Sequence, residues 1–194
     1  MDSFIESLKK YLHSIPKRCR RVDYKKYNKR AAVLIPIVLF NGDLSILFTK
    51  RTAHLKNHSG EISFPGGRHD EIDENLRETV LREAEEELGL YRSDIDILGD
   101  MPQEFSVTYF RVHPFVGVIK NFSPYMLHVD KNEVEDLLLI PITFFLKKEN
   151  RWSEIWLRNE EKHINYFYNY EGKIIWGLTG RITHTFLNVV KKCI

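Results

Sequence analysis

Two apolar segments joined by a tight turn constrain the fold of this chain more than any other feature. Residues 31–40 and 44–49 are rich in Val, Ile, Leu and Phe, and Asn41-Gly42-Asp43 separates them. Asn and Gly tolerate the positive φ angles that a short hairpin turn requires. The sequence therefore predicts a β-hairpin, and with it a sheet around which the rest of the chain must pack.

Helical and strand-like segments are mixed through the rest of the chain. Apolar residues recur at helical spacing in three segments, and four further segments are strand-like. Hairpins combined with helices favour a mixed sheet covered by helices over a doubly wound parallel sheet. We therefore predict an α/β fold in one domain, in which residues 1–30 form an N-terminal helix and a basic segment, and residues 31–194 form the main body. The predicted helices are 2–15, 74–88 and about 178–190, and the predicted strands are 95–98, 111–120, 137–140 and 163–168.

Composition excludes several classes of protein. With 194 residues, 43% of them apolar and 29% charged, the chain matches an ordinary soluble globular protein. The longest apolar run, residues 31–40, is too short to span a bilayer, and we find no signal peptide or targeting tail. Cys19 and Cys193 suggest neither a disulfide framework nor a zinc site. We expect a cytoplasmic protein without a membrane partner, and leave open whether it forms a homodimer.

The helix predicted at 74–88 carries an unusual acidic face. Glu83 and Glu87 lie one turn apart beside an apolar stripe, and Glu86 extends the same face. Most such charge runs are solvated faces. Like charges at i,i+4 cost a few tenths of a kcal/mol, and acids in a last helical turn oppose the helix dipole by about 0.3–1 kcal/mol each. A bound Mg²⁺ or Mn²⁺ removes both conflicts and provides the chemistry that phosphoanhydride hydrolysis needs.

A glycine pair precedes this helix. Gly66 and Gly67 follow Pro65 and permit a tight turn in which backbone approaches a ligand or ion closely. Asp73, immediately before the predicted helix, is expected to be its N-cap. A glycine pair alone is a weak signal, but its combination with the acidic helix is specific.

Together these residues resemble the Nudix box, a pattern of Gly, five residues, Glu, seven residues and then Arg-Glu-apolar-x-Glu-Glu-x-Gly-apolar. Asp73 holds the acidic position six residues after Gly67, and one extra residue separates it from the second half. The residues that match the second half are Arg82, Glu83, Ala84, Glu86, Glu87, Gly89 and Leu90.

The extra residue and the preceding segment resemble the coenzyme A diphosphatase branch of the Nudix hydrolases. Thr52 replaces a smaller Ser or Ala of that branch, and Lys56 replaces an Arg, which keeps the charge but loses the bidentate fork. The resemblance extends over nearly everything from residue 31 onward. The matching segments are Leu47 to Arg51, Gly60, Phe64 to Gly67, Val112 to Gly117, Asn132 to Val134, Ile140-Pro141 and Ile175 to Arg181.

The resemblance implies a Nudix-type α/β/α sandwich with a mixed central β-sheet. It implies hydrolysis of coenzyme A or a derivative at the diphosphate, which gives adenosine 3′,5′-bisphosphate and a 4′-phosphopantetheine. Arg82 is expected to orient a helix carboxylate, and the catalytic base stays open between Glu83 and a distal acid. The implied metal ligands are Glu83, Glu86 and Glu87, the implied substrate-binding residues are Arg51, Lys56, Gly66 and Gly67, and the distal candidates for the base are Glu133 and Glu135.

Other functions stay open at this point. The helix does not distinguish coenzyme A from ADP-ribose, a dinucleotide or a nucleoside triphosphate as substrate. Residues 17–30 contain eight Lys or Arg residues interleaved with Tyr24 and Tyr27, a pattern typical of RNA-binding or RNA-processing proteins. Acidic residues elsewhere bring the net charge to only +2, so nucleic acid is the less favoured partner. A non-catalytic relative is disfavoured because all three box carboxylates are present.

Overall fold

The computed structural model describes residues 2–16, 25–53, 60–158 and 161–194. In this part of the chain, none of the helices is both long and apolar enough to cross a membrane. The helices are α1 (Asp2–Ser14), α2 (Leu76–Leu88), α3 (Ile142–Leu146) and α4 (Gly177–Val190). The strands are β1 (Lys29–Phe40), β2 (Asp43–Arg51), β3 (Ile62–Ser63), β4 (Gly66–Arg68), β5 (Ile95–Asp100), β6 (Glu104–Phe105), β7 (Phe110–Ile119), β8 (Val134–Pro141), β9 (Arg151–Arg158), β10 (Glu161–Tyr170) and β11 (Lys173–Ile175).

The predicted hairpin is confirmed and forms the centre of the main sheet. Strands β1 and β2 pair antiparallel, and Phe40 lies opposite Asp43 across the turn. Both turn residues have positive φ, 51° at Asn41 and 85° at Gly42, as a two-residue hairpin turn requires. Burial of both strands over most of their length explains why they read as apolar runs rather than as alternating patterns.

The main sheet is mixed, as the sequence predicts. Its central order is β3-β2-β1-β7-β5, and β4, β6 and β8 pair with β1, β7 and β2 respectively. Strands β1 and β7 run parallel, whereas the other pairs are antiparallel. A smaller antiparallel sheet has the order β11-β10-β9. The parallel pair brings residues about 80 positions apart in the sequence into one row at the centre of the molecule.

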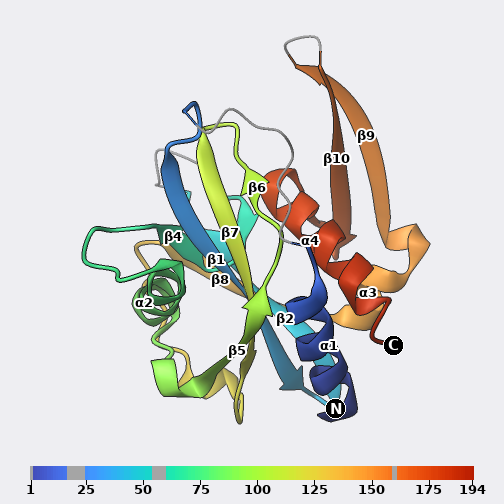
Figure 1. Cartoon of the computed structure of the whole chain (residues 1–194). Coiled ribbons are helices and arrows are strands. Elements are labelled where there is room, and N and C mark those ends of the chain that lie inside the picture. Colours follow the sequence, from blue (N-terminus) through green and yellow to red (C-terminus); the bar gives the residue numbers. More distant parts are fainter. Residues whose placement is uncertain (1, 17–24, 54–59, 159–160) are drawn as a thin grey trace.

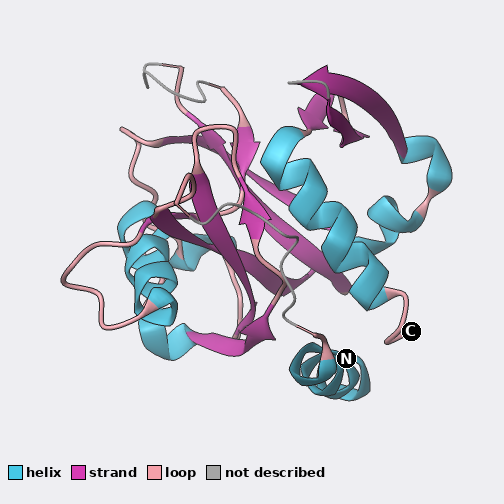
Figure 2. Cartoon of the chain, turned by 45° about the horizontal axis from the view of Figure 1, so that its top comes forward, coloured by secondary structure: helices cyan, strands magenta, loops and turns pink. Residues whose placement is uncertain are grey.

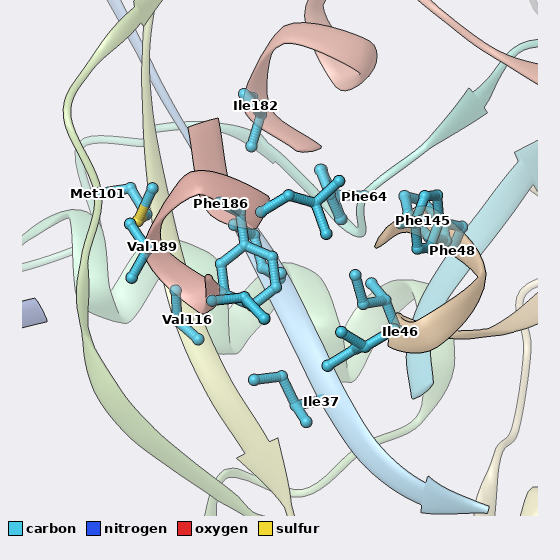
Figure 3. Packing of buried hydrophobic residues seen from close by; sticks show 14 of the residues in the cluster. Ile37, Ile46, Phe48, Phe64, Met101, Val116, Phe145, Ile182, Phe186 and Val189 are labelled. Carbon is cyan, nitrogen blue, oxygen red and sulfur yellow. The ribbon is translucent and has the colours of Figure 1, made fainter. Parts of the chain in front are cut away.

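Helices cover both faces of the main sheet, so the architecture is the expected α/β/α sandwich. Figures 1 and 2 show α2 on one side of the sheet and α1 with α4 on the other. The core beneath α4 is large and apolar, and Phe186 lies within it beside strand residues such as Ile37 and Val116 (Figure 3). The core beneath α2 is smaller and includes Val80 and Leu88. Helix α2, which packs on this smaller core, carries the predicted metal ligands Glu83 and Glu87.

Several short elements have no clear signal in the sequence. The short helix α3 and the strands β3, β4, β6, β9 and β11 were missed, whereas the three predicted helices and the six predicted strands are present. Strand β9 forms a hairpin with β10 that extends away from the main sheet (Figure 1). Its Trp152 stacks on Phe167, and its Trp156 lies at a tilt beside Trp176, so neither ring enters the main core. Residues 17–24 of the basic segment, including Cys19, lie outside the described residues.

Candidate active site

Asn75 and Gly89 fix the two ends of helix α2. The Asn75 side chain accepts hydrogen bonds from the backbone N–H groups of Arg77 (2.9 Å) and Glu78 (3.1 Å). Gly89 ends the helix with φ at 68°, a conformation that Gly adopts without a steric penalty. The prediction that Asp73 caps the helix was therefore wrong. Asn75 is the cap because its side chain, two residues nearer to the helix, reaches the free N–H groups.

The glycine turn and the helix acids touch directly. A Cβ atom on Gly67 would lie 2.5 Å from the carboxylate of Glu83, and one on Gly66 would lie 2.3 Å from the backbone oxygen of Ala32. The N–H of Gly66 donates to Glu87 Oε2 at 3.3 Å. Both positions therefore require glycine, since any side chain would displace either the carboxylate or the strand.

Burial makes the two inner carboxylates unusual. Glu87 is only 4% exposed, and burial together with the charge of Glu83 raises the pKa of Glu87 to about 8, partly offset by Arg51. Burial also raises the pKa of Glu83, against the opposing effect of Arg82. A desolvated pair of acids stores unfavourable electrostatic energy that a cation would relieve.

Arg82 connects the helix acids to the preceding loop. Its Nε and Nη2 atoms donate to the two Asp73 oxygens at 3.0 and 3.1 Å, a bidentate pair. Its Nη1 atom lies 3.0 Å from Glu83 Oε1 and 2.9 Å from Glu86 Oε2. Hydrogen bonding to Arg82 holds the pKa of Asp73 well below its usual range. Asp73, which holds the acidic position six residues after Gly67, thus orients Arg82. Through Arg82 it also orients Glu83.

Glu86 lies apart from the inner pair. Its side chain is 58% exposed and faces Arg82. Within the described part of the chain, no three acidic, histidine or cysteine side chains are gathered closely enough to hold a metal ion together. Glu83 and Glu87 nevertheless fit a divalent cation, because both are carboxylates, both are desolvated and neither charge is fully compensated. The predicted three-carboxylate set remains a prediction.

The two distal acids differ in their surroundings. Glu135 Oε1 lies 2.7 Å from Lys50 Nζ, in an exposed ion pair. The charge of Glu133 instead acts on both Glu83 and Glu87, raising the pKa of each. The backbone oxygen of Glu133 accepts from Thr52 N–H at 2.9 Å, next to an irregularity in the β2–β8 pairing. Of the two distal acids, Glu133 is thus the one whose charge acts on both helix acids, whereas the carboxylate of Glu135 is paired with Lys50.

Among the predicted substrate-binding residues, Arg51 lies close enough to Glu87 to lower its pKa. Its Nε atom is buried and has no hydrogen-bond partner among the described residues. Lys56, the other predicted cation, lies outside the described residues.

His113 was not singled out from the sequence. It lies beside Ala32 across the parallel pair, and Ala32 in turn pairs with Gly67, so one row crosses the sheet toward Glu83. Burial and the nearby charge of Arg111 lower the pKa of His113 to about 4, so the ring is neutral near pH 7. Its Nε2 atom is buried without a hydrogen-bond partner in the described structure. Only the parallel pairing of β1 and β7 reveals this position.

Comparison with known proteins identifies a family. A model described as the NUDIX domain matches residues 28–169. The chain is 42% identical over 161 residues to Nudix hydrolase 22, chloroplastic, of Arabidopsis thaliana, covering 79% of this chain and 53% of that protein. It is 34% identical over 156 residues to a protein of Pectobacterium atrosepticum named uncharacterized Nudix hydrolase NudL, covering 80% of each. The chain thus spans only about half the length of its plant relative.

Solved structures also match. The chain aligns with a Caenorhabditis elegans Ap4A hydrolase at 18% identity and a TM-score of 0.49, covering 58% of this chain and 80% of that chain.

Proposed function

The chain belongs to the Nudix hydrolase family, and we propose that it hydrolyses the diphosphate of coenzyme A or one of its derivatives. The observation that carries the reaction type is the buried Glu83–Glu87 pair held against Gly66 and Gly67. The coenzyme A assignment rests on the sequence of the segment that builds this turn, residues 47–67, and on the extra residue before Arg82. The products are adenosine 3′,5′-bisphosphate and a 4′-phosphopantetheine.

Glu83 and Glu87 would hold a divalent cation, Mg²⁺ or Mn²⁺, with Glu86 contributing after rotation away from Arg82. When bound, such an ion neutralises charge on the diphosphate and lowers the pKa of a bound water. Arg82 and Asp73 keep Glu83 oriented, because their bidentate pair anchors the guanidinium that contacts its Oε1. The family assignment supports this cofactor class.

The remaining steps use this chain's own side chains. Water adds to one phosphorus as the bridging P–O bond breaks, and the water proton must go to a carboxylate. Glu133 suits this role better than Glu135, whose carboxylate is paired with Lys50. Arg51 supplies positive charge beside Glu87, where the diphosphate would add negative charge.

The substrate is tested directly. Purified protein is incubated with Mg²⁺ or Mn²⁺ and, separately, with coenzyme A, ADP-ribose, a deoxynucleoside triphosphate or capped RNA, and products are identified by mass. We expect adenosine 3′,5′-bisphosphate from coenzyme A. Preferential cleavage of another substrate would reject the coenzyme A assignment. Absence of metal-dependent turnover of all four substrates would reject the proposed enzymatic activity. Salt-sensitive RNA binding without turnover would support the nucleic-acid alternative.

Two matched variants test whether Glu133 is the catalytic base. Glu133→Gln should lower kcat for coenzyme A by roughly 10²-fold or more, the usual contribution of a general base. Glu135→Gln removes the same charge two residues away and should change kcat less than about threefold. Equal effects of the two substitutions would remove Glu133 from this role and leave Glu83 as the candidate.

A further inference from the structure

We propose that a cationic pocket at the start of β1 binds a second phosphate of the nucleotide, a phosphate monoester on its ribose, separately from the diphosphate. This inference rests on the proposed function, because coenzyme A carries such a monoester at its 3′ position. A nucleotide that lacks the monoester would leave the pocket unused. The pocket would therefore distinguish coenzyme A from its dephospho form.

The pocket is open, polar and rich in positive charge. Its volume is about 420 Å³. The charged groups that line it are three permanent cations and one carboxylate. Arginine guanidinium groups are well suited to bind phosphate oxygens in a bidentate manner. The lining residues are Asn28, Lys29, Arg30, Arg68, His69 and Glu71.

Two of these cations, Arg30 and Arg68, are not neutralised by a carboxylate in the described structure. The guanidinium groups of Arg30 and Arg68 make no ion pair with any carboxylate of the described residues. Arg82 and Arg181, in contrast, both contact carboxylates. Both arginines line the pocket, so an anionic ligand bound there would meet two cations that lack carboxylate partners among the described residues.

The backbone fixes these two arginines relative to each other and to the catalytic acids. Arg68 directly follows Gly67, whose Cα faces the Glu83 carboxylate, and Arg68 pairs with Ala31 next to Arg30. The N–H of His69 donates to the backbone oxygen of Arg30 at 3.0 Å. The pocket therefore begins one residue, about 3.3 Å of strand, from the glycine turn. A substrate whose diphosphate lies at Glu83 has its nucleotide within reach of this pocket.

A second cavity provides an internal comparison. It has a volume of about 480 Å³ and lies between α1 and the turn that joins β1 and β2. Its charged lining residues are Asp2, Glu6 and Lys120, so acids outnumber cations there. A cavity of similar size thus occurs with the opposite charge balance, and none of its lining residues belongs to α2. Positive charge therefore distinguishes the pocket beside the acids from this second cavity.

Binding of product nucleotides tests the pocket without turnover. Calorimetric titrations compare adenosine 3′,5′-bisphosphate, AMP and inorganic phosphate on the wild type and on Arg30→Gln and Arg68→Gln. We expect each substitution to weaken binding of the bisphosphate by tenfold or more and to change AMP binding less than twofold. Lys148→Gln, which removes one exposed cation outside the pocket, is the matched control and should leave both affinities unchanged.

Several outcomes would overturn the proposal. Equal losses of affinity for the bisphosphate and AMP would mean that the arginines do not bind the second phosphate. Unchanged affinity for both nucleotides would exclude the arginines from the site. Inorganic phosphate bound as tightly as the bisphosphate would indicate an anion site without nucleotide recognition. Both arginines are exposed, so each variant should keep the wild-type melting temperature, which is measured first.

Turnover separates this inference from the proposed function. Wild-type kcat/KM for coenzyme A should exceed that for dephospho-coenzyme A at least tenfold, and Arg30→Gln should remove the difference by raising KM for coenzyme A. Equal wild-type kcat/KM values would reject the pocket but keep the diphosphatase. Failure to hydrolyse either compound would reject the diphosphatase, and a failure to discriminate between the bisphosphate and AMP would then reject the pocket as well.

Discussion

Helices α2 and α4 cover opposite faces of the same sheet, but the residues that they bury differ in chemical character. The buried residues of α4 are apolar or small, with Phe186, Leu187 and Val190 fully inaccessible to solvent. Helix α2 also buries an apolar stripe, yet it adds Glu87 at 4% exposure. Burial of a carboxylate lowers stability unless a cation compensates it. Helix α4 therefore stabilises the fold, whereas α2 gives up stability to hold the groups proposed to act on the substrate.

Glu87→Gln should produce the largest effect and should act oppositely on activity and stability. We expect kcat for coenzyme A to fall by about 10³-fold, roughly 4 kcal/mol in activation free energy, because a ligand charge is lost. The melting temperature of the metal-free variant at pH 8 should rise, because the buried charge is removed. Glu85→Gln, an exposed acid on the same helix, is the control and should change neither. A Glu87→Gln variant that is inactive and also less stable would contradict the conclusion that α2 gives up stability to hold this carboxylate.

Phe186→Ala tests the other face. Removal of this fully buried ring should lower the free energy of unfolding by about 3–5 kcal/mol, the usual cost of a Phe→Ala cavity. Urea denaturation measures this cost. In contrast to Glu87→Gln, kcat at a temperature where the variant stays folded should change less than threefold. A large loss of kcat in folded protein would mean that α4 also shapes the site.

The pH dependence of stability follows from Glu87. Its pKa is about 8 in the folded protein against 4.5 for an ordinary Glu. The folded state favours the protonated carboxyl, so this stabilisation is fully present below about pH 4.5 and is lost as pH rises toward 8. The metal-free wild type should thus melt several degrees lower at pH 8 than at pH 5, on the order of 5 °C. Parallel profiles for the wild type and Glu87→Gln would contradict this assignment.

Asn75→Ala should give the smallest effect. Loss of the two hydrogen bonds that its side chain accepts should cost about 1 kcal/mol of stability. Asn75→Asp retains the acceptor and should be nearly neutral. Thermal or urea unfolding distinguishes these variants. A larger loss for Asn75→Asp than for Asn75→Ala would show that the helix is not capped in this way.

The sequence was sufficient for elements with a strong local pattern. The hairpin at residues 31–49 and the helix containing Glu83 and Glu87 follow from turn chemistry and apolar periodicity. Strand β9 was missed because it belongs to a small separate sheet, in which Trp152 stacks on Phe167 and Ile155 is exposed rather than buried in the main core. Asp73 was misassigned because a position before a helix suits both a cap and a partner for Arg82, and only distance separates the two.

By itself, the sequence determined the α/β class, the acidic helix and the tight turn before it, because each follows from a local pattern. The requirement for glycine in that turn comes from contacts with Glu83 and Ala32, which are distant in the sequence. The tertiary structure decided which groups meet across the chain: Glu133 rather than Glu135 beside the helix acids, His113 in the row of Gly67, and Arg30 beside Arg68. These juxtapositions depend on strand order and register. Long-range pairing fixes them, and no local pattern encodes them.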